Sequence, residues 1–400
     1  MMPKTRYCKD KKIIVLINAL SARRGGGQTY LSHLLDRIDK VDNLDVVIIA
    51  SETLKFKFNP RIKRLAAPLF TENPILRTLW EKYSLPKIIK DLHADVLFCP
   101  GGLINTRVPK NCCTVTMSQN MIPFTPSIRQ QYPIGWQRLR NWLLERAMLR
   151  SLKQADLVIF ISEYAKGVIQ TCAGELSIKS VTIPHGISEH FKIGSGLEPP
   201  RPDWLPDGDY LLYVSIFEPY KNHIEVVRGF HRLKTLRLTH EKLVLAGKND
   251  MPAGIAVREE IKRLGLQDDV ILVGNIAYND LPALYYHSKI NIFASTCENC
   301  PNILLEALGA GRPLLISNIQ PMPEFGADAV VYFDPFSPED FAKQVMLIID
   351  APEELKRLGQ LAAKHAEKYN WDDTTRSTWQ VIRDIASKIV LDRSQSDGLI

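Results

Sequence analysis

Apolar and polar residues follow one another along this chain in the blocks that are typical of a parallel α/β protein. A first apolar run of buried-strand type covers Lys12–Leu20, and apolar residues at helical spacing follow over Thr29–Ile38. The same pattern predicts further strands in the first half at Asp45–Ala50, Asp95–Cys99, Cys113–Ser118, Asp156–Ser162 and Ser180–Ile183. Strands that alternate with helices in this way predict a parallel sheet with right-handed crossovers.

The pattern stops at residues 193–209, a stretch rich in Pro and Gly that we interpret as a linker. A second alternating set of strands is predicted after it, at Tyr210–Ser215, Lys242–Ala246, Val270–Val273, Lys289–Ala294, Leu314–Ser317 and Val330–Phe333. The chain is therefore predicted to form two Rossmann-like domains with ligands between them.

The stretch from Ser288 to Ser317 is predicted to form a strand, a loop, a helix and a second strand. Pro301 suits the first helical position, because a backbone N–H there would have no partner within the helix. Proline, which lacks this N–H, therefore loses no hydrogen bond at that position. Glu298 then lies in the loop and Glu306 lies inside the helix, so both carboxylates could line a crevice at the carboxyl end of the strand. The N–H groups of the Pro301–Ile303 turn offer a phosphate site there. The alternative, a surface Glu and a capping Glu on an ordinary unit, fits the spacing equally well.

The composition limits the class of protein but does not identify a ligand or a reaction. The chain has 400 residues, 45% of them hydrophobic, and a formal net charge of +7, which favours anionic partners without naming one. No apolar run reaches the ~18 residues of a membrane helix. The N-terminus leads directly into a strand and shows no signal peptide, so we expect a cytoplasmic protein. Seven cysteines are spread along the chain, and Cys297-x-x-Cys300 lacks the further ligands of a zinc site, although a redox pair stays open.

Three other segments have candidate binding residues. Gly25, Gly26 and Gly27 follow the first strand and either bring backbone N–H groups to a crevice or form a plain tight turn. Lys221 follows the first strand of the second half, where it is either a diphosphate ligand or a solvated loop lysine. The segment Arg129–Lys153 is basic with interleaved Trp and Leu, which fits contact with an anionic membrane or a helix packed on a sheet. No recognisable nucleic-acid-binding fold accompanies it, so no nucleic acid is expected.

The E-x7-E spacing, followed by Ala-Leu, a Gly and Arg312-Pro313, resembles the donor-site signature of retaining GT-B glycosyltransferases of family 4. The resemblance extends over roughly residues 12–385 and implies an acceptor-side domain at 1–193, a linker at 194–209 and a donor domain at 210–373. It also implies a helix at 374–392 that returns to the first domain, before a tail at 393–400.

The same resemblance implies a role for most of the candidate residues. Glu306 would hold the donor ribose, and Glu298 would contact the sugar hydroxyls or the developing charge. Lys221 and the N–H groups near Asn302 and Ile303 would hold the diphosphate, Gly247 would lie near the donor base or phosphate, and the Gly25–Gly27 loop would face the reaction centre. The turn around His185 matches a turn at the end of the family's first domain.

Two positions depart from the family pattern. Gln119 stands where the family commonly has a His that faces the transferred sugar, and Ile216 stands where an Arg is frequent. An amide takes up no proton at neutral pH, but Gln119 can still hydrogen-bond a sugar hydroxyl. Retaining transfer remains compatible with this, because the donor diphosphate can itself accept the acceptor's proton.

The resemblance thus implies a metal-independent hexosyltransferase, with mannose or glucose as the sugar. The donor would be a nucleoside-diphosphate sugar, with no other cofactor, and the acceptor a saccharide or a lipid-linked saccharide in glycan or polysaccharide biosynthesis. An inactive nucleotide-sugar-binding protein is the alternative. A dinucleotide oxidoreductase is disfavoured, because no G-x-G-x-x-G follows the first strand of either half.

Overall fold

The chain folds into two compact units in the computed structural model, which describes residues 12–22, 25–51, 59–174, 179–192, 198–237 and 240–397, with side chains to residue 387. The first unit takes in the described parts of 1–119, 140–184 and 371–400, and the second those of 120–139 and 185–370. The division therefore falls at Pro184–His185 and not after Ile193, and it assigns 120–139 to the second unit. Residues 193–197 of the predicted linker lie outside the described residues.

The sheet of the first unit is parallel, in the order β3-β2-β1-β4-β5-β6-β7. Its register pairs Val15 of β1 with Val46 of β2 on one side and with Val96 of β4 on the other. The strands are β1 (Ile13–Asn18), β2 (Leu44–Ala50), β3 (Lys63–Ala66), β4 (Val96–Cys99), β5 (Cys113–Ser118), β6 (Leu157–Phe160) and β7 (Ser180–Thr182). The sequence pattern missed β3, because this edge strand reads Lys-Arg-Leu-Ala and has only one half-buried residue.

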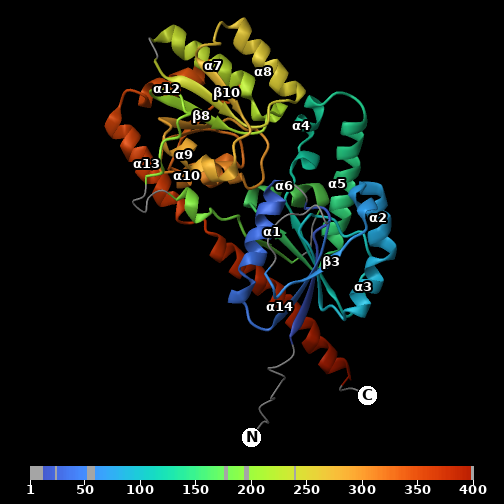
Figure 1. Cartoon of the computed structure of the whole chain (residues 1–400). Helices are drawn as coiled ribbons and strands as arrows, with labels where there is room; N and C mark the ends of the chain where they lie inside the picture. The colour runs from blue at the N-terminus through green and yellow to red at the C-terminus, as the bar shows by residue number, and fades with distance from the viewer. Residues whose placement is uncertain are drawn as a thin grey trace. The chain divides into compact units, whose positions relative to one another are not determined.

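Right-handed crossovers decide which face each helix of the first unit covers. The chain moves one way along the sheet from β1 to β2 and the other way from β3 to β4 and from β5 to β7, so α1 covers one face and the other connecting helices cover the opposite face (Figure 1). These helices are α1 (Gly26–Asp36), α2 (Pro74–Tyr83), α3 (Leu85–Asp91), α5 (Trp136–Gln154) and α6 (Glu163–Ala173). The short 3-10 turns η1 (Ile38–Lys40) and η2 (Leu69–Glu72) precede β2 and α2.

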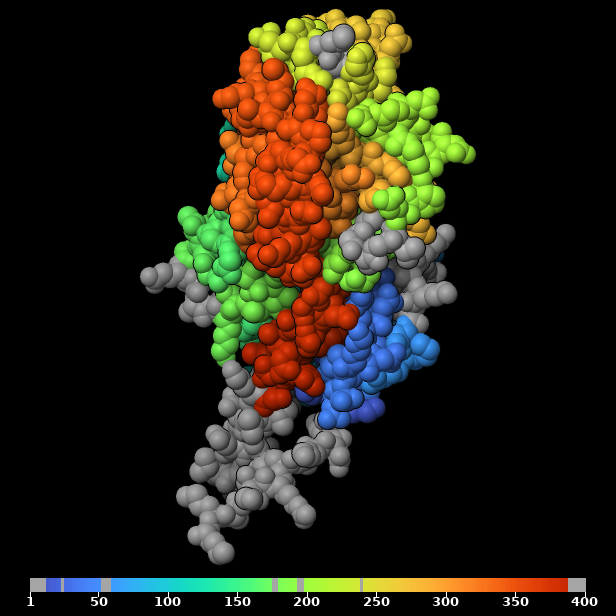
Figure 2. Space-filling model, turned by 90° about the vertical axis from the view of Figure 1, so that its left-hand side faces the viewer, coloured from blue at the N-terminus to red at the C-terminus, as the bar shows by residue number. Residues whose placement is uncertain are grey.

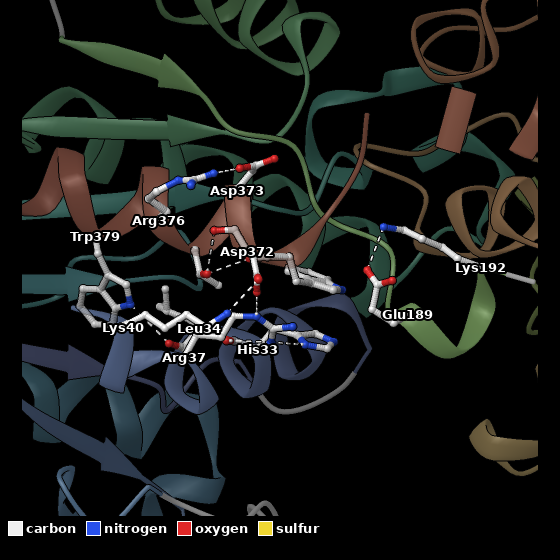
Figure 3. Close-up of polar contacts among 12 residues, drawn as sticks. His33, Leu34, Arg37, Lys40, Glu189, Lys192, Asp372, Asp373, Arg376 and Trp379 are labelled. Atoms are coloured by element: carbon white, nitrogen blue, oxygen red, sulfur yellow. Dashed lines mark hydrogen bonds and ion pairs between the residues drawn. The ribbon is translucent and has the colours of Figure 1, made fainter. Parts of the chain in front are cut away.

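The C-terminal helix α14 (Trp371–Asp397) packs against α1 in the first unit. Asp372 accepts hydrogen bonds from Arg37 Nε (2.5 Å) and Lys40 Nζ (2.8 Å), which lower the pKa of its carboxyl to about 2 (Figure 3). The indole N–H of Trp379 donates to Leu34 O at 3.3 Å. Figure 2 shows the described part of α14 in red beside a blue segment of the first unit, so residues from opposite halves of the sequence pack together there.

The sheet of the second unit is also parallel, in the order β10-β9-β8-β11-β12-β13. Tyr210 of β8 pairs with Lys242 of β9, and Leu211 pairs with Ile290 of β11. The strands are β8 (Tyr210–Val214), β9 (Lys242–Ala246), β10 (Val270–Gly274), β11 (Ile290–Phe293), β12 (Leu314–Ser317) and β13 (Val331–Phe333). All of them match predicted strands to within two residues at each end.

Helices cover both faces of the second sheet. The crossover rule puts α7 and α8 on one face and α9, α10 and α11 on the other; α12 packs on α7 and α13 on α10. Their bounds are α7 (His223–Leu236), α8 (Pro252–Arg263), α9 (Leu281–Tyr286), α10 (Asn302–Gly309), α11 (Met322–Gly326), α12 (Pro338–Ile348) and α13 (Pro352–Ala366). The unit also contains η3 (Ile122–Phe124), α4 (Pro126–Gln131), η4 (Glu189–Phe191), η6 (Pro219–Lys221) and η7 (Tyr278–Asp280). None of the helices searched, which are those of the described residues, is long and apolar enough to cross a membrane.

Candidate donor site

The strand order of the second sheet reverses between β8 and β11, and loops leave the carboxyl ends of both strands there. Such a switch point leaves a crevice between neighbouring loops, where open α/β sheets bind ligands. The loop after β8 contains Lys221, and the loop after β11 contains Glu298 and leads into α10. The topology alone therefore brings three segments with predicted site residues to one edge of the sheet.

Lys221 and Glu298 meet at this edge as a buried ion pair between Nζ and Oε1. Only 6% of the Lys221 side chain and 16% of the Glu298 side chain are exposed, which excludes the solvated loop lysine and the surface glutamate. Ser295 Oγ donates to the same carboxylate oxygen at 2.6 Å. The ammonium also lies 5.4 Å from the Phe293 ring and 5.3 Å from the Tyr220 ring, within the range of a cation–π contact.

Backbone contacts fix the two loops relative to each other. Tyr220 O accepts hydrogen bonds from both the N–H (2.9 Å) and the hydroxyl (3.1 Å) of Thr296. Asn222 has the left-handed conformation (φ 53°), and its amide donates to Ala294 O at 2.7 Å. Tyr213 OH donates to Lys221 O at 2.8 Å from inside the sheet. These bonds hold the Lys221 backbone in place before any ligand arrives.

Glu306 is buried in α10 and has a different partner from Glu298. Its exposed fraction is 8%, and Tyr278 OH donates to its Oε1 at 3.2 Å. Burial raises the pKa of the Glu306 carboxyl to about 8, with the Tyr278 hydrogen bond as a smaller opposing effect. Tyr278 is positioned in turn by edge-on contacts with His190 and Phe191, whose ring centroids lie 5.2 Å from its own. A buried carboxyl with a single hydroxyl donor suits hydrogen bonding to a sugar hydroxyl.

The amino end of α10 is the third part of the site. The helix begins at Asn302, one residue later than predicted, and Pro301 occupies the cap position without a side-chain hydrogen bond to the helix. The first N–H groups of a helix have no partner within the helix itself, so those at Asn302 and Ile303 suit an anion. Asn302 Oδ1 lies 2.8 Å from His185 Nδ1, and burial lowers the pKa of this imidazole to about 4. His185 is thus a neutral support for the start of α10.

Gly247 follows β9 at the same edge and has a structural reason to be glycine. Its φ is +144°, and a Cβ built there would lie 1.9 Å from Ser215 O. Its N–H donates to Gly274 O at 2.7 Å. Any side chain at this position would push apart the loops after β8 and β9.

Cys297 and Cys300 lie inside the loop after β11, and both thiols are buried. Burial raises the pKa of Cys297 to about 12 and that of Cys300 above its ordinary value. A reactive cysteine needs the opposite shift. Cys300 Sγ instead accepts the His185 N–H at 3.4 Å, which is a packing role. Among the described residues no group of His, Cys, Asp and Glu could hold a metal ion.

A segment from the first half of the sequence also contributes to the second unit. In residues 120–139, Tyr132 is 7% exposed, and its hydroxyl donates to Glu218 Oε2 at 3.5 Å. Cys297 Sγ lies 3.8 Å from Thr125 Oγ1. Tyr132 and Tyr278 could not be predicted from the sequence, because neither lies in a motif and each reaches the site from a separate element.

In the first unit, Gln119 and Gly27 lie next to each other at the carboxyl edge of the sheet. Gln119 Nε2 donates to Pro100 O at 3.1 Å, and a Cβ on Gly27 would lie 3.4 Å from Gln119 Oε1. Gly25 (φ +62°) precedes α1, which starts with Gly26. The glycine loop therefore lies at the amino end of a helix and beside an amide that can contact a hydroxyl.

A buried polar group that the sequence analysis missed lies at the switch point of the first sheet. The Glu81 carboxylate, 2% exposed, accepts hydrogen bonds from the side chains of Asn18 (2.8 Å) and Asn105 (2.7 Å). Asn18 ends β1, and Asn105 lies in the loop after β4. No sequence signal marks Glu81, because the pattern of α2 does not show which face is buried.

Comparisons with known proteins agree with this description. Residues 199–365 match the family described as glycosyl transferases group 1, and residues 24–191 match glycosyltransferase family 4. The O-antigen chain mannosyltransferase B of Escherichia coli is 22% identical over 246 residues, which are 59% of this chain and 62% of that protein. The chain thus spans less than two thirds of the length of this relative.

Solved structures of similar fold cover almost the whole chain. A sucrose-phosphate synthase from Thermosynechococcus elongatus has a TM-score of 0.76 at 16% identity and covers 94% of this chain and 100% of its own. Anabaena Alr3699/HepE in complex with UDP-glucose has a TM-score of 0.67 at 13% identity and covers 93% of this chain and 100% of its own. The chain belongs to the group 1 glycosyltransferase family and has the GT-B fold of two Rossmann-like domains.

Proposed function

We propose that the protein is a retaining glycosyltransferase that moves a hexose from a nucleoside-diphosphate sugar to a saccharide or a lipid-linked saccharide. The observation that carries this proposal is the buried Lys221–Glu298 pair beside the amino end of α10. A mannosyltransferase among the relatives and a structural neighbour bound to UDP-glucose support mannose or glucose as the sugar.

The donor would occupy the switch-point crevice of the second unit. Lys221 supplies a fixed positive charge, and the N–H groups of Asn302 and Ile303 supply donors for the diphosphate. Glu306, held by Tyr278, would accept a hydrogen bond from the ribose. Glu298 would contact the hexose hydroxyls or the positive charge that develops on the ring as the bond to the diphosphate breaks.

Binding of the diphosphate would change the Lys221–Glu298 pair. A diphosphate and the Glu298 carboxylate compete for one ammonium, so the incoming anion would draw Lys221 away from Glu298. Ser295 would still donate to Glu298 Oε1 and hold that carboxylate in place. The site therefore keeps a negative charge free for the transition state only after the donor is bound.

The first unit would provide the acceptor side of the reaction. Gln119 and the Gly25–Gly27 loop offer an amide and backbone N–H groups but no side chain that takes up a proton at neutral pH. The acceptor's proton would pass to an oxygen of the leaving diphosphate, so the chain's own residues would orient the substrates and stabilise charge. No metal ion is needed for this scheme.

We place the protein at the cytoplasmic face of a membrane, in contact with it through 129–153. On α5, Trp142 and Leu143 are exposed beside basic residues, as a helix that lies on an anionic surface requires. Lipid-linked acceptors would then be within reach.

Donor turnover tests the proposal. Purified protein is incubated with a panel of nucleotide sugars, EDTA and saccharide or lipid-linked acceptors, while nucleotide release and the anomeric configuration of the product are followed. We expect release from one donor, a retained configuration, and loss of release in Glu306→Ala. Saturable donor binding without release under any acceptor would instead favour an inactive nucleotide-sugar-binding protein, the alternative that Gln119 and Ile216 raise.

A further inference from the structure

Helix α2 presents its polar side to the protein and its apolar side to solvent. Its Glu81 is 2% exposed and bonded to Asn18 and Asn105, whereas Ile75, Leu79 and Tyr83 are 65%, 47% and 70% exposed. Residues four apart lie on one face of a helix. Those three side chains therefore form a stripe that points away from the protein, opposite to Glu81.

The stripe continues beyond these three positions. Leu76 is 43% exposed on the same side of α2, and Leu69 and Phe70 of η2 just before the helix are 66% and 49% exposed. We call these six residues of η2 and α2 the apolar stripe. Contiguous apolar patches on a folded surface usually mark contact with a partner or a membrane. At least 43% of each of these side chains is exposed, which a partner that covers the stripe would explain.

Helix α5 adds positive charge near the stripe. Within 140–154 the exposed side includes Trp142 and Leu143 together with Arg146, Arg150 and Lys153, and the only acid in this range is Glu145. The Arg146 guanidinium lies 4.0 Å from the centre of the Trp142 ring. Leu143, Arg146 and Arg150 are three and four residues apart and therefore share one face.

Two independent observations put α2 and α5 together. Right-handed crossovers place both helices on the same face of the first sheet, as Figure 1 shows. Two consecutive residues of the loop after β4 then bridge them: Asn105 donates to Glu81 of α2, and the Ile104 N–H donates to Ser151 Oγ of α5 at 2.9 Å.

We infer that the apolar stripe and the basic side of α5 form one docking surface for an anionic lipid bilayer. The stripe would lie at the boundary between headgroups and acyl chains, while the arginines and lysines contact lipid phosphates. Exposed Lys82, Lys87 and Lys90 add charge on and after α2. A second copy of the chain fits poorly, because two such basic surfaces would repel each other.

The docking surface extends the membrane contact proposed above for 129–153 to α2, and its effect on the acceptor side of the reaction rests on the proposed function. Glu81 ties α2 to Asn18 at the end of β1, and Arg77 Nη1 donates to Leu20 O at 3.1 Å in the loop that leads toward Gly25. A bilayer in contact with α2 would therefore hold this loop close to the headgroup of a lipid-linked acceptor.

Vesicle binding of the full chain tests the surface. Vesicles of phosphatidylcholine with about one-third phosphatidylglycerol are compared with pure phosphatidylcholine by flotation. The stripe variant is Ile75→Gln/Leu79→Gln/Tyr83→Gln, and the charge variant is Arg146→Gln/Arg150→Gln/Lys153→Gln. The control, Ile255→Gln/Met346→Gln/Leu347→Gln, removes three other exposed apolar residues, which are 47%, 42% and 63% exposed on α8 and α12.

We expect the wild type and the control to bind anionic vesicles, and each of the other variants to bind at least tenfold more weakly with unchanged thermal unfolding. Equal vesicle binding by the stripe variant, or no binding by the wild type, would overturn the inference. A wild-type dimer that the stripe variant abolishes would also overturn it, because a second copy would then cover the stripe. Donor binding is measured in parallel: if it persists in all variants, the proposed glycosyl transfer stands whatever the vesicles show, and a failure of vesicle binding removes only the membrane contact proposed for 129–153.

Discussion

Replacement of Glu306 by Gln should make the protein more stable at alkaline pH. In the folded chain the Glu306 carboxyl is buried and its pKa is raised to about 8 from an ordinary value of 4.5, while the unfolded chain keeps the ordinary value. Between these pH values the folded state binds more protons than the unfolded state, so the free energy of unfolding falls as the pH rises through this window. Gln has nearly the same size as Glu and can accept the hydrogen bond from the Tyr278 hydroxyl, but it has no charge to bury.

The magnitude follows from the same pKa difference. At ~1.4 kcal/mol per pH unit, the cost of ionising Glu306 in the folded state reaches roughly 5 kcal/mol at most near pH 9, and water entry into the crevice will reduce it. We therefore expect Glu306→Gln to unfold at a higher temperature than the wild type at about pH 9 and at nearly the same temperature at about pH 5.

Scanning calorimetry without nucleotide at both pH values measures this effect, with Glu353→Gln on the exposed side of α13 as the matched control. The same stabilisation at both pH values, or none at either, would refute the assignment of a buried, mostly protonated Glu306.

Three further predictions concern other residues of the second unit. Lys221→Met should lower the free energy of unfolding by about 3–5 kcal/mol, because Glu298 is left buried without its cation, and Lys221→Met/Glu298→Gln should recover most of this loss. If denaturant titrations show that the effects of the two substitutions simply add, the two residues are not coupled. His223 has a pKa lowered to about 3, by burial and then by Lys221, so stability should fall as the pH drops below 6.5, and His223→Phe should flatten this acid loss in melts near pH 5. Unchanged acid sensitivity would contradict that assignment. Gly247→Ala should unfold at a lower temperature and bind the donor weakly, because its Cβ would clash with Ser215 O; wild-type melting and affinity would count against the close approach.

The sequence predicted most of the architecture because buried parallel strands are short apolar runs that need no partner to be recognised. Lys242–Ala246, Cys113–Ser118 and Leu314–Ser317 were placed at their observed ends. β3 was missed because an exposed edge strand has no apolar period to detect. The boundary between the two units at Pro184–His185 could not be predicted, because no change in composition marks it. The same is true of the assignment of 120–139 to the second unit.

The candidate donor site was predictable only as far as it is local in the chain. The spacing singled out Glu298 and Glu306 as candidates, and the strand order then explains why Lys221, 77 positions from Glu298, reaches the same edge of the sheet. Tyr278, Tyr132 and Ser295 act through single hydroxyl groups, which sequence patterns do not distinguish from any other Tyr or Ser. The inverted orientation of α2 was equally hidden, because its apolar stripe looks the same in sequence whether it faces the sheet or solvent.

The most direct test of the account is equilibrium binding of UDP-glucose and GDP-mannose in the presence of EDTA. Binding is compared between the wild type and Lys221→Met/Glu298→Gln, a variant that removes the buried pair without leaving a lone charge. The account predicts saturable binding of one donor by the wild type and a loss of at least tenfold in affinity in the variant, which should remain folded. Equal affinity in the two proteins would contradict the claim that the Lys221–Glu298 pair is the donor site.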